Sequence, residues 1–475
     1  MADIRKNFGY NIILNISTYV ASLITFPYTS RVLGAEAIGI VTYVNQFVQY
    51  FILFSMLGVV GIGTREIAAC GNDEKKRSET FSSLLGISTA FTLIVLVIYG
   101  LCILFIPTFI EYKKLFLIGG AQILFTTFQI EWFFRGIEDF RYITIRNIAI
   151  RVIYIILLFV FVKSESDYII YFILSTGVIV INAIINMLYS KKFISFHLTK
   201  ENLRNTWKPF SKQFAILGAN NIMNSFYSSF NVVYLGLVCT KTEVGYYSVS
   251  NKIMTICLGV ITAFSLVMLP RMSSLAGEKD REQFNDLLKK SFAVIIDACI
   301  PLCIMLICYA PYIVLILSGN GFERAILPLR IIAPVIVINA LAQIVVWQVE
   351  MPLHKDKAIL TASIIGAVVG VTLNFALVKQ NGVVGSAIVL CCSVLASFIY
   401  NLWYCIYNEL MYFPTEKLLS VIFKSLPYVL LWIILEMFIE NKWVIFGVGS
   451  SLSLLYWVIL NKEIFMGFVK SYFKR

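Results

Sequence analysis

The chain has 475 residues, of which 59% are hydrophobic and only 14% are charged, and its mean hydropathy is +0.83. Soluble domains are about half apolar and about a quarter charged, so this composition excludes a soluble protein and indicates a chain that crosses a membrane many times. The formal net charge of +12 does not indicate nucleic-acid binding, because Lys and Arg in membrane proteins first reflect orientation.

The chain opens with two long apolar segments, 9–30 and 38–63, joined by a short turn that contains Gly34. The first segment is longer than the core of a signal peptide and lacks a small-residue cleavage site, so we expect a retained span. Polar side chains recur every three or four residues, which places them on one face of each helix. They are Asn11, Asn15, Thr18, Ser22, Thr25 and Thr29, then Thr42, Asn45, Gln46 and Gln49. Such stripes are costly against lipid, so we expect them to face protein or water.

Apolar runs of about twenty residues, the length that crosses a bilayer as a helix, recur along the whole chain. The predicted spans are 9–30, 38–63, 82–105, 115–134, 142–162, 168–190, 210–238, 245–269, 291–317, 326–350, 358–378, 384–407, 419–439 and 443–460. We therefore expect an all-α polytopic membrane protein with fourteen transmembrane helices. With the N-terminus placed inside, the inner connections hold roughly three times as many Lys and Arg as the outer ones, which predicts both termini in the cytoplasm.

The sequence indicates an internal repeat. A shift of 206 residues aligns Gly39 with Gly245, Thr42 with Ser248, Asn45 with Asn251, and Arg65 with Arg271. An internal duplication is the simplest explanation, and coincidence between two generic membrane helices is the alternative. The duplication predicts a six-helix lobe at 1–195, a second at 196–410, and two added helices with a cytoplasmic tail at 411–475. Repeats of this kind typically place a transport site where the halves meet.

Charged residues inside the predicted spans are the first functional candidates, since they are rare there. Lys252 follows Asn251 on a polar helix face, and we favour a role in a polar cavity over a lysine that reaches to the headgroups. Arg151 either forms an ion pair with Glu131 or a neighbour, or contacts a substrate. Arg31, at the outer end of the first span, is either an interfacial anchor or a substrate contact.

Among the acidic residues, Asp297 lies well inside a predicted span and is followed by Pro301. A buried carboxylate there carries a proton, binds sodium, or pairs with a buried cation. Glu131 is a second candidate for ion coupling. Glu350 is expected near the inner interface in contact with solvent, and Trp132 in an interfacial aromatic belt.

The sequence contains no signature of catalysis. It has no paired carboxylates in a polar loop, no Ser-His-Asp set and no phosphate-binding glycine loop, so we expect no enzyme activity and no ATP hydrolysis. The ten cysteines lie mostly in apolar runs without ligand spacing, so we expect neither a metal site nor a cofactor.

Several segments resemble one family of exporters over essentially the whole chain. These segments are Asn7–Asn11, Phe26–Gly34, Gly39–Tyr43, Gly61–Ile67, Trp132–Tyr142, Leu269–Arg271 and Asn381–Ala387. They resemble the polysaccharide flippases, the Wzx-type O-antigen and oligosaccharide transporters of the MATE-like (MOP) exporter superfamily. The resemblance implies two six-helix lobes that face each other in a V, with two extra helices.

The resemblance also implies a function. Members translocate an undecaprenyl-pyrophosphate-linked oligosaccharide from the inner to the outer leaflet of the bacterial cytoplasmic membrane. The family cavity is lined mainly by helices one, two, seven and eight. Because pyrophosphate is anionic, the substrate-binding candidates are cations and neighbouring amides. They are Arg31, Lys252, Arg151, Asn45, Asn251 and Asn224. Coupling to a proton or sodium gradient, with Asp297 and Glu131 as candidates, and association with a polysaccharide polymerase are further expectations, and membrane lipid surrounds the chain.

Three other functions are alternatives. A cation-coupled multidrug antiporter of the same fold favours acidic sites for cationic drugs, whereas the predicted cleft here offers cations. A membrane enzyme such as a polymerase or acyltransferase needs a substantial outer loop, and none is visible. A scramblase-like or scaffold protein predicts that Lys252→Ala leaves surface polysaccharide unchanged.

Overall fold

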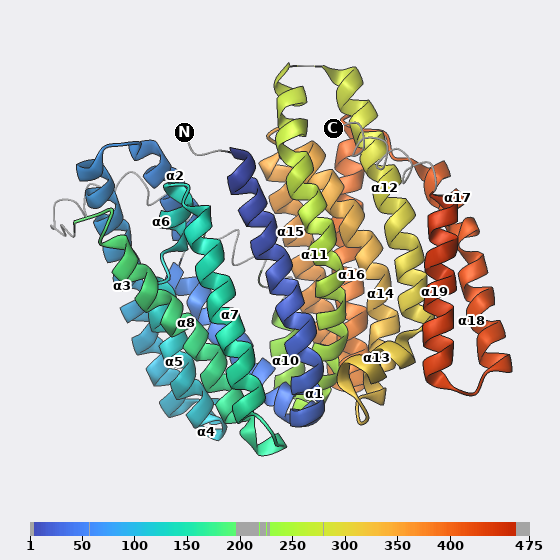
Figure 1. Ribbon diagram of the computed structural model, residues 1–475, viewed down its shortest axis with the longest axis horizontal. Helices are drawn as coiled ribbons and strands as arrows, with labels where there is room; N and C mark the ends of the chain where they lie inside the picture. Colours follow the sequence, from blue (N-terminus) through green and yellow to red (C-terminus); the bar gives the residue numbers. More distant parts are fainter. Residues whose placement is uncertain are drawn as a thin grey trace. The chain divides into compact units, whose positions relative to one another are not determined.

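The computed structural model describes residues 4–56, 58–195, 218, 225, 229–278 and 280–461, and every regular element in this part of the chain is helical (Figure 1). The predicted all-α polytopic membrane fold is therefore confirmed. Contacts divide the chain into two compact units, Met1–Gly245 and Tyr246–Arg475. The lobe boundaries at 195/196 and 410/411 stay predictions.

The first unit is built from one long bent helix and several shorter ones. Its elements are α1 (Ile4–Met56), α2 (Val59–Cys70), α3 (Glu74–Phe105), α4 (Pro107–Glu111), α5 (Lys113–Thr127), α6 (Glu131–Gly136), α7 (Phe140–Phe161), η1 (Glu165–Asp167), α8 (Tyr168–Ser190), α10 (Phe230–Val238) and the first turn of α11 (Lys241–Glu278). Helix α1 packs on α3, α5 and α7, and α5 packs on α8.

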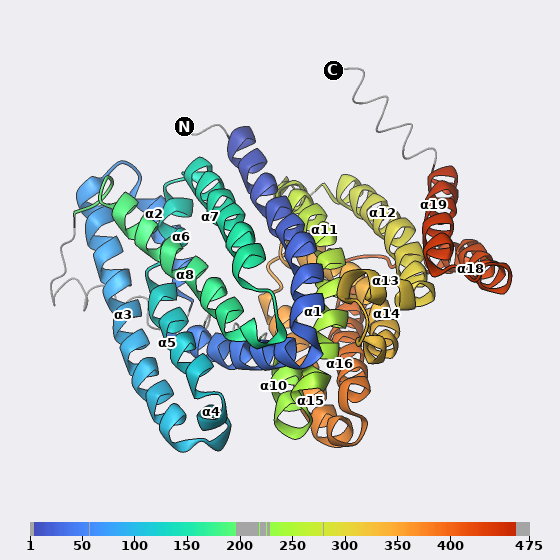
Figure 2. The same ribbon diagram turned by 60° about the horizontal axis from the view of Figure 1, so that its bottom comes forward.

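Helix α1 contains the two segments that the sequence predicts at the start of the chain. They are separated at Gly34, whose φ of 73° and ψ of 176° are not helical. A positive φ is strained for residues with a Cβ, so glycine is the residue that allows the break. Figure 2 shows the resulting bend in α1. The predicted turn between the first two segments is thus confirmed, as a break at a single glycine.

The second unit contains the rest of α11 and the helices that follow it. They are α12 (Arg281–Cys308), α13 (Ala310–Ser318), η2 (Glu323–Ala325), α14 (Ile326–Ile344), the π-helical turn η3 (Val345–Glu350), α15 (Asp356–Leu373), the π-helical turn η4 (Asn374–Val378), α16 (Lys379–Tyr407), α17 (Thr415–Lys424), α18 (Leu426–Phe438) and α19 (Lys442–Leu460). Helix α14 packs on both α12 and α16, and α15 packs on α16.

Ten helices in the described residues are long and apolar enough to cross a membrane. Two of them, of 62 and 52 residues, contain the breaks at Gly34 and Gly382, so each holds two of the predicted spans. The predicted span 115–134 corresponds to α5, which has only 15 residues, and most of 210–238 lies outside the described residues. The chain is a multi-pass membrane protein, and the count of fourteen spans stays a prediction.

The two glycines that the repeat aligns lie at a close backbone contact inside the first unit. A Cβ on Gly39 would be 1.7 Å from the Lys241 carbonyl oxygen, and a Cβ on Gly245 would be 1.9 Å from the Ala35 carbonyl oxygen. The shift of 206 residues that aligns Gly39 with Gly245 also aligns Ala35 with Lys241. Each glycine therefore lies against the equivalent backbone carbonyl of the other copy, as in a contact related by a twofold axis. This reciprocity supports the predicted duplication.

The last helices cover one side of α12 and α13 in the second unit. Gly449 of α19 lies so close to Tyr309 that a Cβ would be 2.3 Å from the phenol oxygen. Tyr312 donates a hydrogen bond of 2.9 Å to Glu436 of α18. A small apolar cluster completes the contact, formed by Cys308, Tyr309, Tyr312, Leu435 and Ile445.

Candidate functional site

Helix α1 has three distinct faces before its break at Gly34. One face is apolar and exposed, with Ile13 and Ile16 more than half accessible. A second face packs on α7, where Thr144 donates to the Tyr10 carbonyl. The third face is the polar stripe, whose threonine hydroxyls donate to backbone carbonyls of the same helix. Internal bonds of this kind satisfy a hydroxyl without a partner from another helix.

Arg151 joins α7 to α1. Its guanidinium donates to the Ser17 hydroxyl at 2.5 Å and to the Leu14 carbonyl at 3.1 Å. The ion pair with Glu131 that the sequence offered as one alternative is not formed, because Glu131 pairs with other arginines. Arg151 thus holds the helix that bears the polar stripe.

Two further candidates lie around the Gly34 break. Arg31 is exposed in the last turn before Gly34, and Asn45 is half-buried in the part of α1 that follows the break. Nearby, the Lys241 ammonium lies 3.9 Å from the centre of the buried Tyr43 ring, a cation–π contact. Asn224, the remaining amide candidate of the first unit, lies outside the described residues.

Lys252 lies on α11 and is half-buried, as is its neighbour Asn251. The backbone carbonyl of Asn251 accepts a hydrogen bond from Thr255. Lys252 itself makes no hydrogen bond or ion pair with any residue that the structure describes. A half-buried ammonium without a partner in a membrane-spanning helix is unfavourable for folding, and such residues generally serve a function.

Glu131 lies in a network of buried polar groups. The Arg146 guanidinium, only 4% exposed, lies 2.5 Å from one Glu131 oxygen, and Arg135 lies 3.7 Å from the other. Arg146 also donates to the Asn186 side chain, which accepts a second hydrogen bond, of 2.9 Å, from Tyr142. The network therefore links α6, α7 and α8, and Glu131 is occupied by cations in this conformation.

Asp297 is likewise engaged with a cation. Its carboxylate lies 2.7 Å from the Lys417 ammonium of α17, and its backbone carbonyl accepts a hydrogen bond from the Trp457 indole of α19. Asp297 and Lys417 line a pocket of about 490 Å³ with Lys424 and Asn461. The structure thus places this ion-coupling candidate against the last helices of the second unit.

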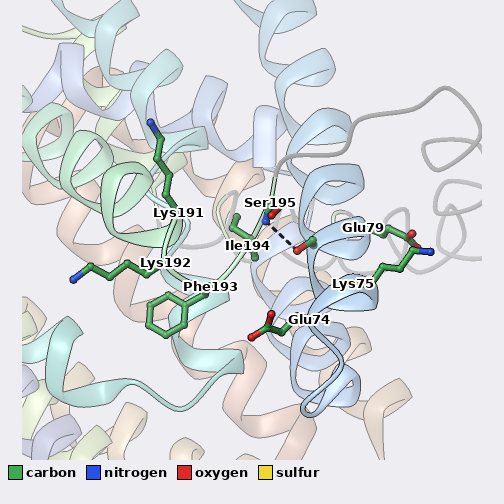
Figure 3. Close-up of a pocket in the computed structure, with 9 residues that line it drawn as sticks. Glu74, Lys75, Glu79, Lys191, Lys192, Phe193, Ile194 and Ser195 are labelled. Atoms are coloured by element: carbon green, nitrogen blue, oxygen red, sulfur yellow. Dashed lines mark hydrogen bonds between the residues drawn. The ribbon is translucent and has the colours of Figure 1, made fainter.

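A separate pocket of about 460 Å³ lies in the first unit, between the start of α3 and residues 191–195 (Figure 3). The Ser195 amide donates to the Ser78 hydroxyl at 3.1 Å, and Arg77 donates to the Phe193 carbonyl. The wall includes charges of both signs, among them Glu74, Lys75 and Lys191. None of the candidate residues lines this pocket.

Comparison with known protein families shows to which family the chain belongs. The profile of the polysaccharide biosynthesis protein family matches residues 4–276, more than half of the chain. The chain belongs to this family. A MatE profile matches residues 216–376, so the predicted place among the Wzx-type members of the MATE-like superfamily is confirmed.

Individual proteins agree with this assignment. The chain is similar to the putative O-antigen transporter of Escherichia coli K12, with 25% identity over 395 residues that cover 82% of this chain and 93% of that protein. It is also similar to the probable low-salt glycan biosynthesis flippase Agl15 of Haloferax volcanii, with 22% identity over 206 residues, 43% of each protein. Among solved structures, the lipid II flippase MurJ in an inward closed conformation has a TM-score of 0.75, covering 96% of this chain and 99% of that chain at 14% identity. At this identity the likeness shows the fold alone.

In this family member, two of the segments that carry the resemblance pack against each other. A Cβ on Gly63 of α2 would be 2.5 Å from the Trp132 ring of α6, and a Cβ on Gly136 would be 2.7 Å from Ile67. Trp132 is only 2% exposed and stacks on Phe81, so the expected place in an interfacial belt is wrong for this residue. The small glycines on the facing helices bring the indole into the interior.

The expected solvent contact of Glu350 is also wrong, because this side chain is fully buried. The sequence analysis also missed the role of Arg146, which it treated only as one of the positive charges in the inner connections. Its spacing from Glu131 crosses a helix boundary and a turn at Glu138, so helical periodicity could not pair them. Asn186 comes from a third helix, and only the packing brings it to the network.

The pair of the buried Arg146 and the half-buried Glu131 gives a stability prediction. Arg146→Met removes the cation closest to the Glu131 carboxylate, so we expect the free energy of unfolding to fall by about 1.5–3 kcal/mol, the contribution of a hydrogen bond to a charged group. Lys290→Met is the matched control, because both partners of the Lys290–Asp286 pair are exposed and such pairs contribute about 0–1 kcal/mol. Unfolding in detergent, followed by tryptophan fluorescence, compares the two variants.

A double variant shows whether the cost comes from the unpaired charge. Glu131→Gln combined with Arg146→Met removes both charges, so we expect it to be more stable than Arg146→Met alone. Equal stability of the single and double variants contradicts the assignment of this pair as a coupled unit.

Proposed function

We propose that the chain is a flippase that moves an undecaprenyl-pyrophosphate-linked oligosaccharide from the cytoplasmic to the outer leaflet of the bacterial cytoplasmic membrane. The observation that carries this proposal is the similarity to the O-antigen transporter, which extends over 82% of this chain and 93% of the relative. The glycan flippase of Haloferax volcanii points to the same class of substrate. The relatives transport or flip, so the chain is a transporter and not an enzyme.

The physical problem explains which residues the substrate needs. Sugars and pyrophosphate cannot cross hydrocarbon unaided, whereas the polyprenyl tail can remain in lipid. A polar pathway must therefore offer hydrogen bonds to the sugars and positive charge to the pyrophosphate. The partly exposed polar stripe of α1 offers the first, and the Lys252 ammonium, which has no partner among the described residues, offers the second.

The transport cycle that we propose is alternating access. Two six-helix lobes within a set of fourteen spans open in turn to either leaflet, with both termini in the cytoplasm. Arg31, Arg151 and Lys252 contact the pyrophosphate, and Asn45, Asn251 and Asn224 contact the sugars. A proton or sodium gradient drives the cycle, and the product passes to the polysaccharide polymerase machinery.

The experiment uses the full chain in proteoliposomes with a fluorescent undecaprenyl-pyrophosphate-linked oligosaccharide. The fraction of label that a membrane-impermeant quencher reaches reports movement between leaflets. We expect faster equilibration than in vesicles without protein, and no movement of a neutral phospholipid. Equal rates with and without protein contradict the proposal. A drug-resistance assay in a pump-deficient host tests the multidrug alternative, for which we expect no increase in resistance.

A further inference from the structure

Glu350 ends the π-helical turn η3 and is fully buried. One carboxyl oxygen accepts a weak hydrogen bond from the Cys405 thiol, at a sulfur–oxygen distance of 3.7 Å. The other oxygen is buried and has no hydrogen-bond partner among the residues that the structure describes. A carboxylate in such a place would carry an uncompensated charge out of water, at a cost of several kcal/mol. A neutral carboxyl avoids this cost.

The elements packed against η3 supply no cation to Glu350 in the described part of the chain. Helices α14, α15 and α16 contact this turn. The only titratable side chain of α14, Arg330, donates to the Ile307 carbonyl far along the helix. On α16, Cys405 contacts Glu350 and Tyr404 directly precedes it, while His354 and Lys355 lie in the connection and Asp356 and Lys357 in the first turn of α15. None of them forms an ion pair with Glu350.

Further unpaired polar atoms surround the same turn. Gln348, within η3, is fully buried and neither its amide oxygen nor its amide nitrogen has a partner. Asn401 lies one helical turn before Cys405 on α16, on the same face, and its side-chain oxygen is buried and unpaired. Unpaired buried groups destabilise a fold, and π-helical turns are frequent at functional sites. The combination indicates a functional site and not packing alone.

The connection that follows Glu350 in the sequence contains residues exposed to solvent. The connection 351–355 follows Glu350 directly, and Met351 and His354 in it are exposed. The backbone amide of Lys355 donates to the Glu350 backbone carbonyl at 2.8 Å, so the backbones of these two residues lie side by side. His354 has a positive φ of 56°, a conformation that is uncommon for residues other than glycine. A movement of this connection would expose Glu350.

We propose that Glu350 is a proton-binding site of the transport cycle. The carboxyl holds its proton while α16 covers it. When the connection 351–355 moves, the carboxyl O–H bond breaks, the proton passes to water, and the Lys355 ammonium balances the carboxylate that remains. This inference rests on the proposed function, because it ties the release of the proton to a step of lipid-linked oligosaccharide transport.

The first test is chemical modification of the full chain in vesicles with dicyclohexylcarbodiimide, which reacts with protonated carboxyls in apolar surroundings. Mass spectrometry of peptides gives the modified fraction of each acidic residue. At neutral pH we expect Glu350 to be modified at least about tenfold more than the exposed Glu282, because a solvent-exposed glutamate is almost fully ionised at that pH. Absence of modification at Glu350 from acidic to neutral pH overturns the proposal.

The second test is the pH profile of transport. Glu350→Gln keeps the shape of the neutral carboxyl but cannot release a proton, so we expect its transport rate to lose the pH dependence of the unmodified protein. Glu282→Gln is the matched control and keeps that dependence. An unchanged pH profile in Glu350→Gln overturns the proton site. If the unmodified protein moves no oligosaccharide lipid but Glu350 is modified as expected, the proposed function fails and the protonated carboxyl stands.

Discussion

We expect Lys252→Ala to lower surface polysaccharide by about tenfold or more, because a hydrogen bond to a charged group contributes about 1.5–3 kcal/mol. The amount of protein in the membrane is expected to stay the same. The physical reason is that the Lys252 ammonium has no partner in the described residues and, under the proposed function, pairs with the anionic pyrophosphate of the substrate. The measurement is complementation of a strain that lacks this transporter, with polysaccharide quantified on gels and protein by immunoblot.

A second substitution at Lys252, Lys252→Met, separates function from structure. Lys252 is half-buried and has no partner among the residues that the structure describes, so removing its charge from a membrane-spanning helix is not expected to weaken folding. We therefore expect the unfolding temperature of Lys252→Met to equal or exceed that of the unmodified protein. A residue whose substitution lowers transport but not stability serves function at a cost to the fold. Arg146→Met, by contrast, is expected to lose stability.

Two controls accompany the Lys252 variants. Lys289→Ala removes a lysine that is exposed on α12, and we expect normal polysaccharide. Lys252→Arg keeps the charge but changes its geometry, so we expect partial function.

Arg31→Ala should lower surface polysaccharide as Lys252→Ala does. Normal polysaccharide in both alanine variants removes these two residues from the binding site.

Gly39→Ala is expected to have the largest effect on stability. Its Cβ would lie 1.7 Å from a backbone carbonyl oxygen of Lys241, and backbone cannot turn aside as a side chain can. The helices must separate, so we expect a loss of at least about 3 kcal/mol, at the upper end of the cost of overpacking. Gly245→Ala should behave in the same way. Thermal unfolding in detergent measures both.

The matched control is Gly177→Ala on α8, because nothing lies within 4 Å of the Cβ it adds. We expect that variant to be as stable as the unmodified protein or slightly more so, since alanine favours helix. The two contact glycines should also be strongly non-additive, because one alanine already separates the backbones that both glycines bring together. Additive losses in the double variant would show that the two contacts are independent.

The places of the long apolar helices follow from the chain alone. A helix that crosses a bilayer needs about twenty apolar residues, and this requirement is local, so a window along the sequence can find it. The breaks at Gly34 and Gly382 are local too, because glycine adopts backbone angles that other residues avoid. The polar stripe of α1 is visible in the sequence because the side chains on one face of a helix recur every three or four residues. The alignment of Gly39 with Gly245 also came from sequence, and the structure adds that the two lie at one contact.

The pairing of charges was decided only by tertiary structure. Both Arg146 and Arg151 follow Glu131 at distances that the sequence cannot rank, and the short helix α6 and its turn place Arg146 against it. Burial of Glu350 depends on the π-helical turn and on α16, which returns about fifty residues later. Spacing along one helix determines which residues share a face, but the rotation of each helix against its neighbours determines what that face meets. Electrostatic partners in a helical membrane protein therefore follow from packing between segments distant in sequence, whereas the spans themselves follow from local composition.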